Sequence, residues 1–160
     1  MRTKAATWFE CKIRYDKTME DGTQKKVTEQ YVVDALSFEE AERLIVEEMS
    51  AFISGEFDIK DIKIASYREV FFSDYNIEDR WYKAKVAFIS VDEKTQKEKR
   101  TNYVYLVNAA SFNGAVSAVD RVMGATMIDY VIVAMSETRT MDVLEYKSKD
   151  AGNGTEDKTA

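Results

Sequence analysis

The sequence predicts an α+β fold built by tandem duplication of one β-β-α-β unit. Short strings recur in the same order at offsets that drift only between 69 and 74 residues, and residues 8–13, for example, match residues 81–86. Within each copy, two stretches of alternating apolar and polar residues precede a stretch with helical spacing. A period this long indicates a duplicated supersecondary unit, not a solenoid repeat of 20–50 residues.

The first copy begins with a strand over residues 8–16, where apolar and charged side chains alternate. A turn at residues 20–22 and a second strand from Val27 to Ala35 follow. Ser37 with Glu40 predicts a capping box at the start of a helix, which we expect to end near Gly55. A third strand covers residues 59–64 and is expected to run on or bend through residues 70–72.

The second copy repeats this plan with strands at residues 80–91 and 101–109. Ser111 is expected to cap a helix that reaches about Met123, and a strand at residues 128–137 follows, with residues 140–146 as a possible extension. A right-handed crossover then places the third strand of each unit beside the first, which gives the strand order 2-1-3. Three strands and one helix are marginal alone, so we expect two pseudo-twofold related units to share one core.

These patterns predict three segments along the chain. Residues 1–74 form the first repeat, residues 75–146 form the second, and the polar residues 147–160 form a disordered tail.

Composition argues against most catalytic chemistry. The chain has no histidine, which is the commonest general base and zinc ligand, and its one cysteine, Cys11, falls on the apolar face of a strand. No glycine-rich phosphate loop is present. We therefore expect no enzyme activity, no cofactor and no metal site. The lack of an apolar leader or a run of about 20 apolar residues indicates a cytoplasmic protein with no membrane partner.

Charge is segregated within a net value of −6. Residues 38–56 hold six glutamates and one arginine, whereas residues 80–105 hold seven basic and three acidic residues. Trp8 and Trp81 fall on the polar side of equivalent strands, beside basic residues. Exposed aromatic rings among cations are what binding of single-stranded nucleic acid needs. The candidate binding residues are Trp8, Lys12, Arg14, Lys25, Lys26, Trp81, Lys83, Lys85, Lys97, Lys99 and Arg100.

A structural role for the same residues is the stronger interpretation. Large aromatic side chains are mostly buried, and lysines at hairpin tips are usually solvated and deter aggregation at strand edges. The preferred function is thus a non-catalytic interaction or assembly module that binds a protein partner or itself through strand edges or an apolar sheet face. Binding of single-stranded nucleic acid is the alternative.

Residues 7–12 and 31–42 resemble a family of uncharacterised small proteins, catalogued as a domain of unknown function in gut Bacteroidales and their phages and mobile elements. The resemblance implies a bacterial cytoplasm, or that of an infected bacterial host. It brings no catalytic residues to this chain.

Overall fold

A computed structural model describes residues 1–145 of the 160-residue chain, so the predicted tail at 147–160 lies outside the described residues. Two helices and two β-sheets confirm the α+β class. The described chain divides into two compact units: residues 1–8 with 64–142, and residues 9–63 with 143–145. The predicted division at residues 74 and 75, and the shared core, stay predictions. Neither helix among residues 1–145 has the length and apolarity needed to cross a bilayer.

A four-stranded sheet belongs mainly to the unit of residues 9–63. Its strand order is β4-β2-β3-β9, and a single helix follows β3 in the chain. The elements are β2 (Trp8–Thr18), β3 (Gln24–Asp34), α1 (Phe38–Ser50), β4 (Phe57–Ala65) and β9 (Thr140–Leu144).

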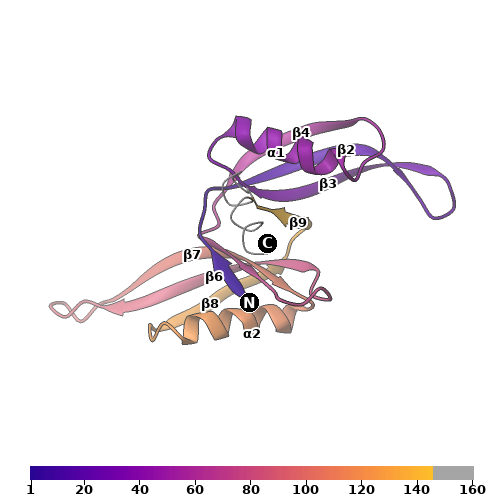
Figure 1. The fold of residues 1–160 in the computed structure, drawn as a ribbon. Helices are drawn as coiled ribbons and strands as arrows, with labels where there is room; N and C mark the ends of the chain where they lie inside the picture. The colour runs from indigo at the N-terminus through magenta and orange to yellow at the C-terminus, as the bar shows by residue number, and fades with distance from the viewer. Residues whose placement is uncertain (146–160) are drawn as a thin grey trace, which may run out of the picture. The chain divides into compact units, whose positions relative to one another are not determined.

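A five-stranded sheet belongs to the other unit, with the order β1-β5-β7-β6-β8 (Figure 1). Strands β7 and β8 both run antiparallel to β6, whereas β5 runs parallel to β7. The elements are β1 (Arg2–Lys4), β5 (Glu69–Phe72), β6 (Arg80–Val91), β7 (Glu98–Ala109), α2 (Phe112–Gly124) and β8 (Tyr130–Glu137).

Each β-β-α-β segment has the strand order that the sequence predicts. In both sheets the first strand of the segment lies between its second and third strands, as β2 lies between β3 and β4, and β6 between β7 and β8. Three details differ. Residues 69–72 do not extend β4 but form β5 beside β7, residues 140–144 form β9 beside β3, and β1 has no counterpart in the prediction.

Serine side chains cap both helices. The Ser37 Oγ accepts a hydrogen bond from the Glu40 amide at 3.1 Å, and the Leu36 amide donates to the Glu40 carboxylate at 3.0 Å. In α2, the Ser111 Oγ accepts from the Gly114 amide at 3.1 Å. The predicted end of the first helix near Gly55 is wrong. Helix α1 ends at Ser50, and Gly55 lacks the positive φ of a C-terminal cap glycine.

Each helix covers one face of its own sheet. Alternate residues of β2 point at α1, and alternate residues of β6 point at α2, which gives one buried apolar cluster beneath each helix. Each fully buried aliphatic side chain contributes about 1.5–3 kcal/mol relative to exposure. Cluster members include Phe9, Cys11, Ile13, Leu44 and Ile45 under α1, and Tyr82, Ala84, Val86, Ala115 and Val119 under α2.

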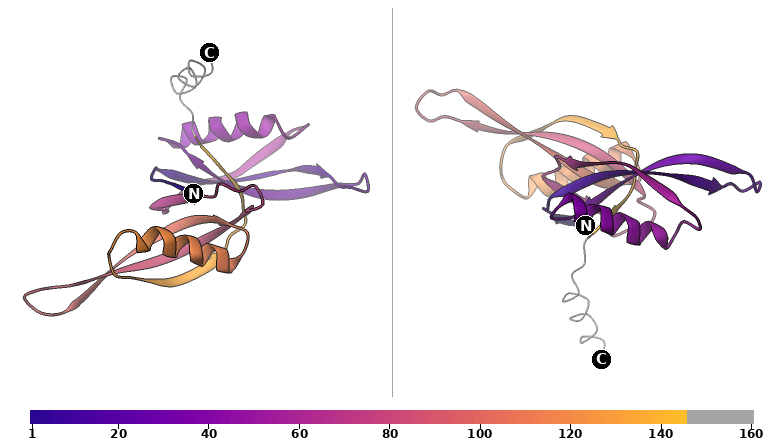
Figure 2. Two further views of the ribbon diagram at one scale, coloured as in Figure 1. Left: turned by 60° about the horizontal axis from the view of Figure 1, so that its bottom comes forward. Right: turned by 90° about the horizontal axis from the view of Figure 1, so that it is seen from above.

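Helix α2 is too short to cover the hairpin of β6 and β7. Its 13 residues span about 20 Å at the α-helical rise, whereas the 12 residues of each strand span about 40 Å. Pairing between β6 and β8 also stops at Phe88. Residues 90–100 therefore project beyond the sheet as a two-stranded hairpin, here called the β6–β7 ribbon, and all of them are exposed (Figures 1 and 2).

The cap of α1 gives a direct test of these local interactions. We expect Ser37→Ala to lower the free energy of unfolding by about 1 kcal/mol, because the Glu40 amide loses its side-chain acceptor. Chemical denaturation followed by circular dichroism measures the change. The control is Ser50→Ala, which removes only a hydroxyl bonded to the Val46 carbonyl at the other end of the helix. An equal loss in both variants would contradict the cap assignment.

Candidate interaction surfaces

Both tryptophans lie in the interior. Trp8 is 0% exposed and Trp81 is 4% exposed. The Trp81 ring packs edge-on against Phe72 at 5.8 Å, and its carbonyl accepts hydrogen bonds from the Thr138 amide and hydroxyl. The face of this sheet turned away from α2 is also buried here, since Leu106 is 0% exposed. As the alternation along the strands predicts, the two rings lie on the side of their strands opposite the helix-facing residues. Both rings are nevertheless buried, so neither has a free face on which a base could stack.

Five of the predicted basic residues come together on the hairpin of β6 and β7. Lys83 and Lys85 are exposed on β6, where they alternate with buried Ala84 and Val86. The other three are Lys97, Lys99 and Arg100, all exposed on the β6–β7 ribbon.

The remaining four basic residues lie on the hairpin of β2 and β3, in the other unit. Lys12 is half-buried, and Arg14, Lys25 and Lys26 are exposed. Residues 10–29 carry five basic and five acidic side chains, so this hairpin is electrically neutral overall. The two hairpins thus differ in charge although they have equivalent places in the β-β-α-β plan.

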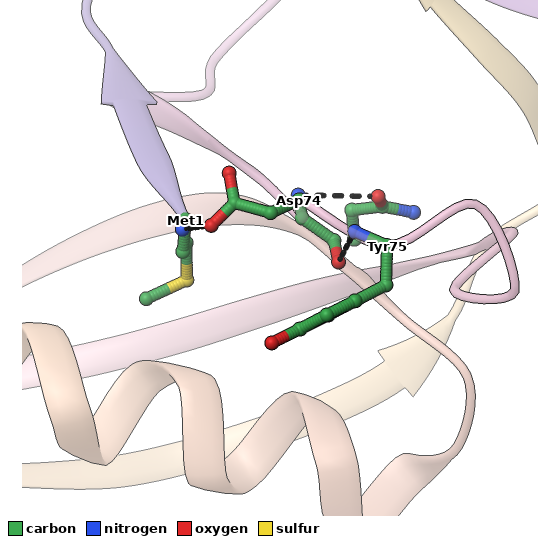
Figure 3. A network of polar contacts seen from close by, with 5 residues as sticks. Met1, Asp74 and Tyr75 are labelled. Atoms are coloured by element: carbon green, nitrogen blue, oxygen red, sulfur yellow. Dashed lines mark hydrogen bonds and ion pairs between the residues drawn. The ribbon is translucent and has the colours of Figure 1, made fainter.

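A network of polar contacts ties the segment that follows β5 to Met1 and to the end of β7 (Figure 3). The Asn108 side chain donates to the carbonyls of Glu78 and Arg80 at 2.8 and 3.0 Å, and it accepts from the Ser73 amide. The Met1 ammonium pairs with Asp74 beside a cavity of about 140 Å³. These bonds hold the segment between β5 and β6 against the end of β7.

A wider groove of about 540 Å³ runs beside β2 and the α1–β4 connection. Phe52 lies beyond the end of α1 and is exposed on this groove. Nearby, the Tyr15 hydroxyl donates to the Glu29 carboxylate at 2.7 Å. Burial and this hydrogen bond raise the pKa of Tyr15 to about 12, so the phenol stays protonated.

Cys11 is a core residue. Its side chain is 0% exposed beneath α1, and burial raises the pKa of the thiol to about 12. A protonated, inaccessible thiol is a poor nucleophile. Across residues 1–145, the structure contains no group of three or more cysteine or acidic side chains placed to hold a metal ion.

An apolar surface lies at the open edge of the five-stranded sheet. Strand β8 pairs with β6 on one side, and no other described strand pairs with it. Val131 and Val133 are 41% and 49% exposed, and no charged residue occurs between Tyr130 and Ser136. Met127, just before β8, is 92% exposed. We call Met127, Ile128, Val131 and Val133 the β8 edge surface.

The edge strand β4 of the other sheet is built differently. It carries four charged side chains, Asp58, Lys60, Asp61 and Lys63, which deter pairing with another chain. Strand β8 has no such charges but has a β-bulge at Val133, where its register with β6 shifts. The bulge interrupts the ladder, so β8 is a poor template for open-ended growth.

The sequence interpretation did not single out the β8 edge surface. The signal that could have indicated it is the contrast between the uncharged run at residues 130–136 and the charged run at residues 57–63. The alternation of apolar and polar residues does not show which strand lies at an edge, because that position depends on the strand order of the folded sheet.

Comparison with protein families matches most of the chain to a domain of unknown function. The sequence model of DUF4494, a domain of unknown function, covers residues 7–146. No curated protein and no solved structure matches the chain.

The raised pKa of Cys11 predicts how stability depends on pH. Because the thiol has its higher pKa in the folded state, its contribution to stability is complete below about pH 9 and is lost as the pH rises toward 12. We expect the free energy of unfolding to fall more steeply over this range in the wild type than in Cys11→Val, which cannot titrate. Urea denaturation at several pH values measures both slopes. Equal slopes would show that the thiol is accessible to water in the folded state.

Proposed function

The chain belongs to the DUF4494 family, a domain of unknown function, and we propose that it is a non-catalytic interaction module that assembles with a second copy of itself through the β8 edge surface. The observation that carries the proposal is an edge strand that has no charged residue from Tyr130 to Ser136 and exposes Val131 and Val133. Exposed apolar side chains gathered on an edge strand are typical of interaction sites in folded proteins.

Twofold closure explains why a second copy fits. Two copies related by a twofold axis bring the same surface of each molecule together, so β8 meets β8 and each valine meets an apolar side chain. The bulge at Val133 stops a continuous ladder, which favours a closed pair over a fibre. Each aliphatic side chain that becomes fully buried stabilises the dimer by about 1.5–3 kcal/mol, which offsets part of the entropy lost on association.

Met127 adds independent support. Its φ of 62° places a non-glycine residue in the left-handed region, and its side chain is almost wholly exposed. Left-handed backbone costs an L-residue roughly 1–2 kcal/mol, and glycine or asparagine would reduce that cost. A large apolar side chain gains nothing by projecting into water. Burial against a second copy would give this methionine a role.

The module's wider setting is also part of the proposal. We infer that the two β-β-α-β segments arose by tandem duplication and keep a pseudo-twofold relation, which the equivalent serine caps at Ser37 and Ser111 support. We place the protein in the cytoplasm of a bacterium, or of a phage-infected bacterial host, on the strength of the sequence resemblance. The buried, protonated Cys11 supports a non-catalytic role.

Binding of single-stranded nucleic acid is the weaker function for this fold. That hypothesis depends on base stacking against Trp8 and Trp81, and both rings are buried. Stacking would require the tryptophan rings to move out of the interior, whereas the apolar side chains of the β8 edge surface are already exposed.

Charge substitutions on β8 test the assembly. We expect the wild type to be a dimer by multi-angle light scattering at about 100 µM, and the double variant Val131→Lys/Val133→Lys to be a monomer, because paired lysines cannot be buried without counter-charges. The matched control is Ile64→Lys, on the charged edge strand β4, which should remain a dimer. A wild type that stays monomeric, or a dimer that survives the double substitution, would contradict the proposal.

A further inference from the structure

We propose that the β6–β7 ribbon binds B-form DNA by entering its major groove. This surface is separate from the β8 edge surface, and the proposal rests on the shape, rigidity and charge of residues 90–100. It needs neither tryptophan.

The shape of the ribbon fits that groove. Residues 90–100 form two paired strands and a turn, and no third described strand pairs with them. Two paired strands lie about 4.8 Å apart, and the B-DNA major groove, roughly 12 Å wide, admits a two-stranded ribbon. The major groove of A-form RNA is too narrow for side chains to read, so the shape also discriminates between the two duplexes.

The turn of the ribbon is well organised. The Asp92 amide donates to the Lys97 carbonyl at 2.9 Å, and the Gln96 amide donates to the Asp92 carbonyl at 2.8 Å. The Asp92 carboxylate accepts from the Lys94 amide at 2.8 Å. A turn fixed in this way loses little conformational entropy on binding.

The charges of the ribbon are available to a polyanion. Lys94, Lys97 and Lys99 form no ion pair among residues 1–145, so their ammonium groups can meet phosphates. Residues 90–100 carry four basic and three acidic side chains. Two of the acidic groups interact within the ribbon, because the Glu98 carboxylate lies 3.9 Å from the Arg100 Nε and the Asp92 carboxylate accepts within the turn, whereas Glu93 is exposed. Lysines that neutralise phosphates release counterions, and this release drives the binding.

Two further lysines continue the basic surface onto the sheet. Lys83, Lys85 and Ile89 lie on the face of β6 that is turned away from α2. Arg100 pairs with Ile89 across the two strands, so its side chain lies on the same face. A duplex that receives the ribbon in its groove would then have its backbone close to these cations. Residues 80–105 together carry seven basic and three acidic side chains.

The net charge of −6 does not oppose this placement. The unit that carries the ribbon, residues 1–8 with 64–142, has twelve basic and eleven acidic side chains. The other unit, residues 9–63 with 143–145, has eight basic and fifteen acidic side chains, and residues 146–160 have three of each. The acidic excess therefore belongs entirely to the unit without the ribbon.

Fluorescence anisotropy with a labelled 20-base-pair DNA duplex tests the proposal on the full chain. We expect binding at about 50 mM salt that weakens as salt is added, and at least tenfold weaker binding by Lys97→Glu/Lys99→Glu. The slope of log affinity against log salt should also fall by about 2, one for each lost phosphate contact. The matched control, Lys25→Glu/Lys26→Glu on the neutral β2–β3 hairpin, should bind within about twofold of the wild type.

Additional variants and competing nucleic acids complete the binding experiment. The milder variant Lys94→Gln/Lys97→Gln should also weaken binding, and circular dichroism confirms that each variant is folded. The Val131→Lys/Val133→Lys variant should bind DNA no more weakly than the wild type, because it adds positive charge while it disrupts assembly through β8. Absence of binding at low salt, equal affinity for single-stranded DNA or duplex RNA of the same sequence, or an equal loss in the β2–β3 control would overturn the proposal.

Discussion

The packing of α2 against alternate residues of β6 and β7 is the constraint on which the exposed features of its unit depend. Tyr82, Ala84 and Val86 face the helix, so the residues between them, including Lys83 and Lys85, must face away. The helix is about half as long as the strands beneath it, so the remainder of the hairpin extends without cover. The same helix returns the chain to β8 at the far edge of the sheet. One packing arrangement thus produces both a projecting basic ribbon and an open apolar edge.

The edge strands β4 and β8 differ in the charge of their side chains, and the proposed assembly depends on this difference. A sheet edge presents unpaired amide and carbonyl groups, and a folded protein must prevent uncontrolled pairing there. Strand β4 does so with four charges, which suits an edge that stays in water. Strand β8 relies on a bulge and keeps its side chains apolar, and Met127 beside it keeps a costly backbone conformation. In the proposed assembly, this combination limits open-ended growth and leaves apolar side chains for a second copy to cover.

Local patterns predicted most of the fold. Alternation located β2 and β6, the serines located both helix starts, and the helix-connected third strands took the expected places beside β2 and β6. The errors arose where distant parts of the chain decide the outcome. Residues 69–72 and 140–144 are short apolar segments, and no local signal says which sheet each will join. The Trp81 ring likewise packs against Phe72, which lies on β5, a strand that β7 separates from β6 in the sheet. The alternating pattern did correctly predict that Lys83 and Lys85 are exposed.

Hydrogen–deuterium exchange at increasing protein concentration tests the central claim, that β8 is the surface through which this chain assembles. We expect exchange of amides within residues 130–137 to slow as the concentration rises from about 1 to 100 µM, because pairing with a second copy protects them. Amides of the charged edge strand β4, residues 57–65, should exchange at a constant rate. Concentration-independent exchange in β8, or protection that appears in β4 instead, would contradict the account.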